Sequence, residues 1–156
     1  LDPTSIPMRV FSNPPMDPAM ALTTEWRRCE SPAANGQGNA RSLARTQSVV
    51  SHGGEGDGRR FLSEKTRRRV FEQQTSGVDM VLGLPVSFGM GYAFPSPEMP
   101  VGGPGACFWG GWGGSLVIND LDKRMTFTYV MNQMGDGTVG DARGAGLLMA
   151  AYAALS

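Results

Sequence analysis

The sequence predicts an α+β fold in which a three-stranded antiparallel sheet packs against helices. Three observations support this prediction. From Met125 to Met131, β-branched residues alternate with aromatic and apolar ones, and this two-residue period is typical of a strand with two different faces. Residues 142–155 are rich in alanine and place their leucines on one helical face. Most of the 22 glycines lie in the second half of the chain, where they bound short segments of strand character.

The first half of the chain predicts a connector followed by two helices. Residues 1–34 form a Pro-rich segment without a clear period, which predicts an extended connector lying on a surface, and residues 35–156 form the folded portion. Asn39 is a typical N-cap and predicts a helix that ends near His52. Ser63 predicts the N-cap of a second helix that ends near residues 74–77.

The second half of the chain predicts the sheet. Residues 86–94 are expected to form one strand. Residues 107–109 begin a second strand, which glycines interrupt and residues 115–119 continue, and residues 125–131 form the third. Helix 142–155 then covers one face, and an edge of the sheet stays open. Because an open edge exposes unpaired backbone groups, we expect part of the fold to lie outside this chain.

Charge and composition argue against several classes of partner. The chain has 14 basic and 14 acidic residues, and its one dense basic run, Arg67–Arg69, is expected on a solvated helix face. Nucleic-acid binding is not expected, because aromatic residues do not interleave with these arginines. No apolar run reaches the roughly 18 residues of a membrane span, and the first residues lack a signal pattern. A cytoplasmic location is the default expectation.

The residues with reactive or metal-binding side chains are scattered. Cys29 and Cys107 are expected to be two buried or semi-buried thiols, with a disulfide as the alternative. The single histidine, His52, is expected to end its helix rather than to serve in catalysis. Neither a metal site nor a cofactor is expected, because no cluster of ligating residues is present.

Several segments resemble one protein family in the correct order. Residues 113–120 and 125–135 resemble the last two strands of the β-lactamase-like serine esterases, also called family VIII carboxylesterases, and residues 140–144 resemble the start of the final helix of that family. Residues 35–45 and 54–63 are similar to upstream segments. The resemblance covers about residues 33–156. It implies the C-terminal part of a β-lactamase/transpeptidase-like fold that is incomplete without an N-terminal half.

This resemblance also implies the site. The family uses an SxxK motif that carries the nucleophile, a tyrosine motif that carries the base, and a strand motif beside the acyl group. Trp109, Gly110 and Gly111 fit the strand motif, which makes them the substrate-binding residues and favours esters over β-lactams. The next residue, Trp112, would donate its backbone N–H to the oxyanion. The alternative interpretation of this segment is a tight glycine bend with two core tryptophans.

The other two motifs are absent. Neither Lys65 nor Lys123 has a serine three residues before it, and no tyrosine begins a Tyr-x-Ser or Tyr-x-Asn motif. The resemblance places both motifs N-terminal to the matched region. We therefore expect this chain to be the C-terminal part of a serine esterase that hydrolyses small carboxylic esters. It is expected to be active only together with its N-terminal half. That half is encoded by the same gene or forms a separate chain. The alternatives are an acyltransferase of the same family and a non-catalytic binding or structural module of the same fold. A homo-oligomer is a further expected form of association.

Overall fold

The computed structural model describes residues 2–15 and 17–155. The chain divides into two compact units. One unit comprises the residues up to Gly38 together with Val78–Pro85, and the other comprises Asn39–Gly77 together with the residues from Val86 onward. The second unit contains the main sheet and the candidate site.

The N-terminal segment is helical rather than extended, so this part of the sequence prediction is wrong. It contains α1 (Ile6–Phe11), the 3-10 helix η1 (Pro18–Leu22) and α2 (Thr24–Arg28). Prolines occupy the first turns of α1 and η1, where the missing N–H costs no hydrogen bond and the fixed φ favours a helix. Asp17 and Thr23 cap the two helices that follow them.

The main sheet is antiparallel, with strand order β5-β6-β7. Its strands are β5 (Ala106–Gly110), β6 (Leu116–Asp120) and β7 (Met125–Tyr129). The expected number of strands is confirmed, but their assignment is not, because residues 107–119 form two paired strands instead of one interrupted strand. The chain reverses at Gly113 and Gly114, whose φ values of +88° and +119° are accessible mainly to glycine.

Residues 86–94 do not form a strand of this sheet, which corrects another expectation. β4 (Pro85–Phe88) pairs instead with β3 (Thr75–Val78) in a separate two-stranded sheet. The chain then turns, with the Gly89 N–H bonded to the Tyr92 carbonyl at 2.9 Å, and only Ala93 bridges to β5. The helix that precedes β3, α4 (Glu64–Val70), ends earlier than expected.

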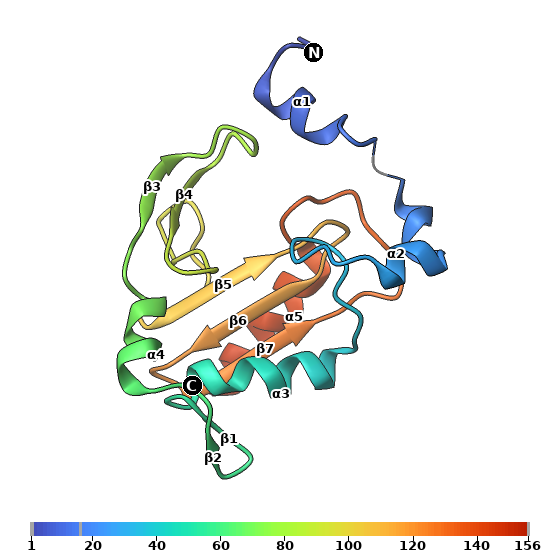
Figure 1. The fold of residues 1–156 in the computed structure, drawn as a ribbon. Helices are drawn as coiled ribbons and strands as arrows, with labels where there is room; N and C mark the ends of the chain where they lie inside the picture. Colours follow the sequence, from blue (N-terminus) through green and yellow to red (C-terminus); the bar gives the residue numbers. More distant parts are fainter. Residues whose placement is uncertain (1, 16, 156) are drawn as a thin grey trace. The chain divides into compact units, whose positions relative to one another are not determined.

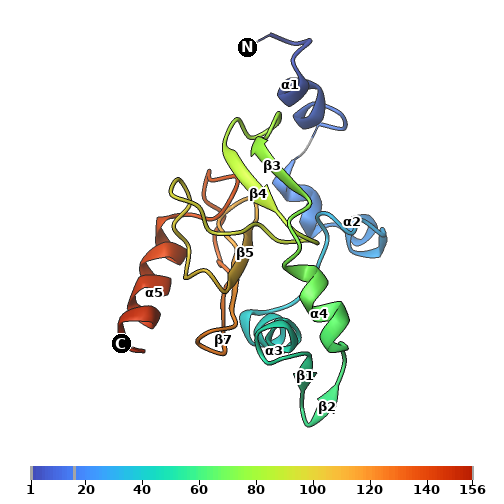
Figure 2. The same ribbon diagram turned by 90° about the vertical axis from the view of Figure 1, so that its left-hand side faces the viewer.

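Two helices cover opposite faces of the main sheet: α3 (Ala40–Ser51) and α5 (Ala142–Ala153). Figure 1 shows α3 in front of the three strands and α5 behind them, and the turned view in Figure 2 shows the strands between the two helices. The α5 side holds the apolar core. Its buried residues are Ala93, Phe108, Leu116, Ile118 and Leu148.

The α3 side of the sheet carries a chain of polar hydrogen bonds. Gln47 Oε1 accepts bonds from the Tyr92 hydroxyl at 2.6 Å and from Asn119 Nδ2 at 3.1 Å. Asn119, which is fully buried, accepts in turn from the Thr126 hydroxyl at 2.7 Å. Thr126 also contacts the Ser51 hydroxyl at 2.7 Å. Because buried polar groups require partners, this network fixes the position of α3 against β6 and β7.

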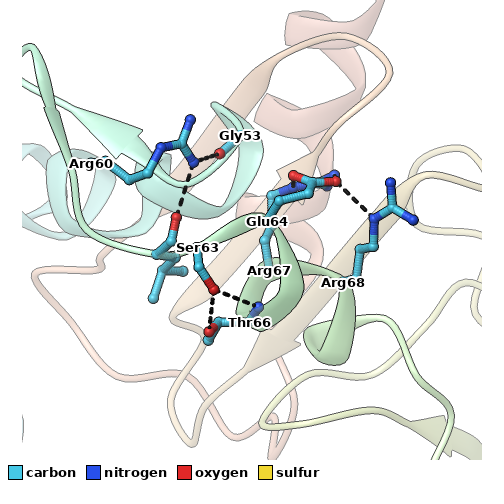
Figure 3. Close-up of polar contacts among 8 residues, drawn as sticks. Gly53, Arg60, Ser63, Glu64, Thr66, Arg67 and Arg68 are labelled. Carbon is cyan, nitrogen blue, oxygen red and sulfur yellow. Dashed lines mark hydrogen bonds and ion pairs between the residues drawn. The ribbon is translucent and has the colours of Figure 1, made fainter.

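Local side-chain contacts explain where the helices begin. Asn39 caps α3 in a reciprocal capping box with Ser42, as the sequence predicts. His52 is the C-cap of this helix, also as expected. The Ser63 hydroxyl accepts a 3.1 Å bond from the Thr66 N–H at the start of α4, and Glu64 bonds both Arg67 and Arg68 (Figure 3).

A small hairpin joins α3 to α4. Its strands are β1 (Glu55–Gly56) and β2 (Arg59–Arg60). The Arg60 guanidinium donates to the carbonyl oxygens of Gly53 at 3.0 Å and Leu62 at 3.1 Å, and these bonds close the base of the hairpin (Figure 3).

Two further features concern the whole described chain. Cys29 and Cys107 are free thiols, so the disulfide alternative is not realised. Cys107 is buried as expected, whereas the expected burial of Cys29 is wrong, because this thiol is exposed. Across residues 2–15 and 17–155, none of the helices has the length and apolar character to cross a membrane.

Candidate functional site

The segment Trp109–Gly111 lies at the end of β5, where the chain enters the turn toward β6. Hydrogen bonds fix this turn from both sides. The Gly111 N–H donates to the Ser115 carbonyl at 2.8 Å, and the Gly114 N–H returns to the Gly111 carbonyl at 3.1 Å. On the other side, the Gly113 N–H donates to the Gly137 carbonyl at 2.9 Å. The residue between these anchored glycines is Trp112.

The backbone N–H of Trp112 points away from the hydrogen bonds that close this turn. In an antiparallel ladder, successive residues direct their backbone groups to opposite sides. Gly111 bonds toward β6, whereas Phe108 bonds to Ala93 on the outer side of β5. By this alternation, the N–H of Trp112 faces the outer side. No acceptor for it exists among the residues that the structure describes.

The two tryptophans of the segment have different environments. Trp109 is half-buried and packs against Phe88, with ring centroids 4.8 Å apart. Trp112 exposes 42% of its surface. The interpretation as a glycine bend with two core tryptophans therefore applies to Trp109 alone, because the Trp112 side chain is too exposed to belong to the core.

Close packing against backbone atoms of the chain itself requires glycine at position 110, and position 111 is crowded by a side chain. A Cβ on Gly110 would lie 2.6 Å from the Gly140 backbone nitrogen, and a Cβ on Gly111 would lie 2.6 Å from the Ser115 hydroxyl. The loop before α5 thus lies directly against the end of β5. The exposed side of the turn is bordered by Met131 and Met134, whose side chains lie close to Gly113.

A charged pair holds this loop in place. Arg143 donates from Nη1 to the Gln133 carbonyl at 2.9 Å and from Nη2 to the Gly113 carbonyl at 3.2 Å, and its Nε bonds Asp141 Oδ2 at 2.9 Å. The hydrogen bond from Arg143 lowers the pKa of the Asp141 carboxyl below its usual value. Asp141 also caps α5 through the N–H groups of Arg143 and Gly144. The sequence resemblance matches residues 140–144 to the start of the final helix but gives Arg143 no role; the signal is an acidic N-cap followed two residues later by an arginine.

Tyr92 and Tyr152 are unsuited to act as a general base. The Tyr92 hydroxyl donates to Gln47, and the Tyr152 hydroxyl donates to Asp120 at 2.7 Å. Burial raises the pKa of Tyr92, and burial together with the Asp120 hydrogen bond raises the pKa of Tyr152. A raised pKa disfavours the phenolate that a base would need.

A serine–histidine contact in this unit is structural. Ser51 Oγ lies 2.9 Å from His52 Nδ1, but Ser51 is 2% exposed and its hydroxyl also contacts Thr126. His52 Nδ1 lies 3.0 Å from the Ser48 carbonyl, which can only accept, so this nitrogen carries the proton. A nucleophile must be reachable by substrate, and Ser51 is not. Within the described residues, no three His, Cys, Asp or Glu side chains gather as metal ligands.

Comparison with known proteins assigns the family. The Beta-lactamase family model matches residues 3–151. The chain is 36% identical over 113 residues to the Esterase/beta-lactamase LipL of Mycobacterium tuberculosis (strain ATCC 25618 / H37Rv), a match that covers 67% of this chain and 24% of that protein. The chain therefore belongs to the β-lactamase family, and its fold is the β-lactamase/transpeptidase-like α+β fold expected from the sequence.

Two solved structures support the same assignment. The fold is similar to that of a family VIII carboxylesterase, with a TM-score of 0.86 and 34% identity over 92% of this chain and 39% of that one. It is also similar to a penicillin-binding protein homologue from Caulobacter crescentus, with a TM-score of 0.79 and 36% identity over 84% of this chain and 36% of that one. The chain thus spans less than half the length of these relatives.

Proposed function

We propose that this chain forms the oxyanion-binding part of a serine esterase whose nucleophile and base lie in a part of the enzyme outside these 156 residues. One observation carries the proposal: the Trp112 N–H has no acceptor among the described residues, although hydrogen bonds anchor the glycines on both sides of it. A fixed, unpaired backbone donor beside an edge strand is the arrangement that stabilises a developing oxyanion.

The proposed reaction is hydrolysis of a carboxylic ester through an acyl-enzyme. A serine oxygen attacks the ester carbonyl carbon while its proton passes to the general base, and the carbonyl oxygen takes up negative charge as its double bond opens. The Trp112 N–H donates to this oxygen without having to reorient. The intermediate collapses when the alcohol leaves with a proton from the general acid, and water then releases the acid by the same route.

The end of β5 favours neutral substrates. Trp109, Gly110 and Gly111 carry no charged side chain, so this strand offers no cation to a carboxylate-bearing β-lactam. The half-buried Trp109 and the exposed Trp112 offer apolar surface to the acyl or alcohol group. These features support esters as the substrate class.

The test locates the nucleophile in the native protein. Extracts of the source cells are treated with a fluorophosphonate probe, which forms a P–O bond to an activated serine and expels fluoride. Labelled species are isolated and mapped by peptide mass spectrometry. We expect peptides of this chain in a labelled polypeptide or labelled complex, with the modified serine in an SxxK motif outside residues 1–156.

The purified 156-residue chain is the matched control. It should not hydrolyse p-nitrophenyl butyrate, because the chain has no SxxK motif or Tyr-x-Ser/Asn motif. A native polypeptide or complex that contains this chain but never reacts with the probe would favour a non-catalytic module. Turnover by the 156-residue chain alone, abolished by the probe, would overturn the location of the nucleophile.

A further inference from the structure

We propose that Arg143, oriented by Asp141, is a positioning residue that holds the Trp112 amide in its oxyanion-binding orientation. The inference rests on the proposed function and adds a residue to it. The hydrogen bonds of the Arg143 guanidinium go to Asp141, Gln133 and Gly113. Arg143 acts through the Gly113 carbonyl, which belongs to the residue directly after Trp112.

Hydrogen bonds hold the backbone of Gly113 at both its carbonyl and its N–H. Its carbonyl accepts from two donors, the Gly135 N–H at 2.8 Å and Arg143 Nη2 at 3.2 Å, while its own N–H is bonded to Gly137. Gly113 has φ +88°, and a glycine can leave this angle for other positive or negative φ values at little steric cost. Without these bonds, the residue after Trp112 would sample several conformations, and the direction of the neighbouring amide would vary with it.

The guanidinium of Arg143 links the turn to the loop before α5. Its planar fork serves three acceptors at once: the Gly113 carbonyl, the Gln133 carbonyl and the Asp141 carboxylate. One side chain therefore ties the turn after β5 to the loop that leads into α5. A lysine has a single nitrogen on a flexible stem and cannot reproduce this geometry.

Asp141 orients the guanidinium and caps α5 at the same time. Its Oδ1 caps α5 by accepting from the N–H groups of Arg143 at 2.9 Å and Gly144 at 3.2 Å, and its Oδ2 fixes the guanidinium. A Cβ on Gly114 would collide with this carboxylate oxygen, so the turn and the carboxylate lie in direct van der Waals proximity. The N-terminus of α5 thus serves as the fixed base from which Arg143 reaches the turn.

Hydrogen–deuterium exchange tests this role in the 156-residue protein without any need for activity. Arg143→Ala should accelerate exchange of the Gly113 and Gly135 amides at least about tenfold, while the amides of β5 and β6 in the core keep their protection. Asp141→Asn, which retains an oxygen for the helix cap, should produce a smaller change of the same kind. Arg45→Ala is the matched control, because Arg45 is also exposed and forms an ion pair with Asp57 at 2.8 Å.

Kinetics in the complete enzyme identified by probe labelling provides the second measurement. Arg143→Ala and Arg143→Lys should lower kcat about 10- to 100-fold and leave KM within about twofold, because the oxyanion contact forms mainly in the transition state. Unchanged exchange at Gly113 and Gly135 would overturn the proposal, and so would faster exchange with unchanged kcat. Absence of esterase activity in the wild type would refute the proposed function instead, while the exchange result would still decide whether Arg143 holds the turn.

Discussion

The hydroxyl of Tyr152 donates a 2.7 Å hydrogen bond to Oδ2 of Asp120, and this bond joins α5 to the buried end of β6. Asp120 is 1% exposed, and its other oxygen accepts from the Lys123 N–H at 2.9 Å. The pair therefore fixes the covering helix, and with it the loop that packs on the candidate site, to the centre of the sheet.

Tyr152→Phe should destabilise the fold by about 1–3 kcal/mol, because it leaves a buried carboxylate oxygen without this donor. Urea unfolding followed by circular dichroism measures the change. The control is Tyr129→Phe, whose hydroxyl makes no hydrogen bond within the described part of the chain and whose removal should cost little. Equal effects of the two variants would contradict the assigned role of Tyr152.

The stability of the protein should depend on the ionisation of Glu64. Hydrogen bonds from Arg67 and then Arg68 lower the pKa of Glu64 from 4.5 to about 2. A lowered folded-state pKa means that this contribution is complete above the unfolded pKa of about 4.5 and is lost as the pH falls toward 2. The melting temperature of the wild type should therefore exceed that of Glu64→Gln at about pH 6, and the difference should vanish near pH 2. Glu98→Gln, at another exposed position, serves as the control; a gap that stays constant with pH would disprove the linkage.

The two thiols should react very differently with iodoacetamide. Burial raises the pKa of Cys107 to about 12, and its side chain is inaccessible, whereas Cys29 is exposed. Because the thiolate is the reactive species, only Cys29 should be alkylated in the folded protein at mildly alkaline pH. Mass spectrometry should find one adduct under native conditions and two in urea. Rapid modification of both thiols without denaturant would show that the core around Cys107 opens.

Replacement of Trp112 separates the roles of its backbone and its side chain in the complete enzyme. Trp112→Phe keeps the N–H and should have a mild effect, mainly on pocket shape. Trp112→Pro removes the N–H and should lower the rate roughly 100- to 1000-fold, or about 3–4 kcal/mol. Far-UV circular dichroism must show that the proline variant is folded, because proline can also distort the backbone. A folded Trp112→Pro enzyme with near-normal turnover would exclude this amide as an oxyanion donor.

The isolated chain should associate through the outer edge of β7. In this ladder, Leu116 and Ile118 of β6 bond to β7, so the backbone groups of Thr126 and Thr128 face outward, and no partner for them is present among the described residues. Such an edge pairs readily with another strand. Sedimentation velocity should show association of the wild type that Thr128→Pro reduces.

Thr128→Val is the matched variant for this measurement. It loses the same side-chain bond to the Ala40 carbonyl as the proline variant but keeps the edge N–H. We expect it to associate as the wild type does. A strictly monomeric wild-type chain across the concentration range would refute the edge as an association surface.

The local features of the fold follow from the sequence. Asn39 and Ser63 were predictable as N-caps because a capping side chain bonds backbone groups only three residues away. The alternation in residues 125–131 identifies β7, because successive side chains of a strand point to opposite faces that differ in their surroundings. The family was recognisable from ordered segments, and the Trp109–Gly111 motif located the candidate site at the end of a strand.

The pairing of distant segments was decided only by the tertiary structure. The sequence pattern predicts one interrupted strand over residues 107–119, because glycines alone do not indicate whether a chain continues or reverses. In the structure, the positive φ of Gly113 and Gly114 reverses the chain. The contact between Arg143 and Gly113 is likewise not predictable from the sequence. These residues lie 30 positions apart and meet because α5 packs on the sheet. Sequence patterns report on neighbours along the chain, whereas such contacts depend on the burial of whole elements against each other.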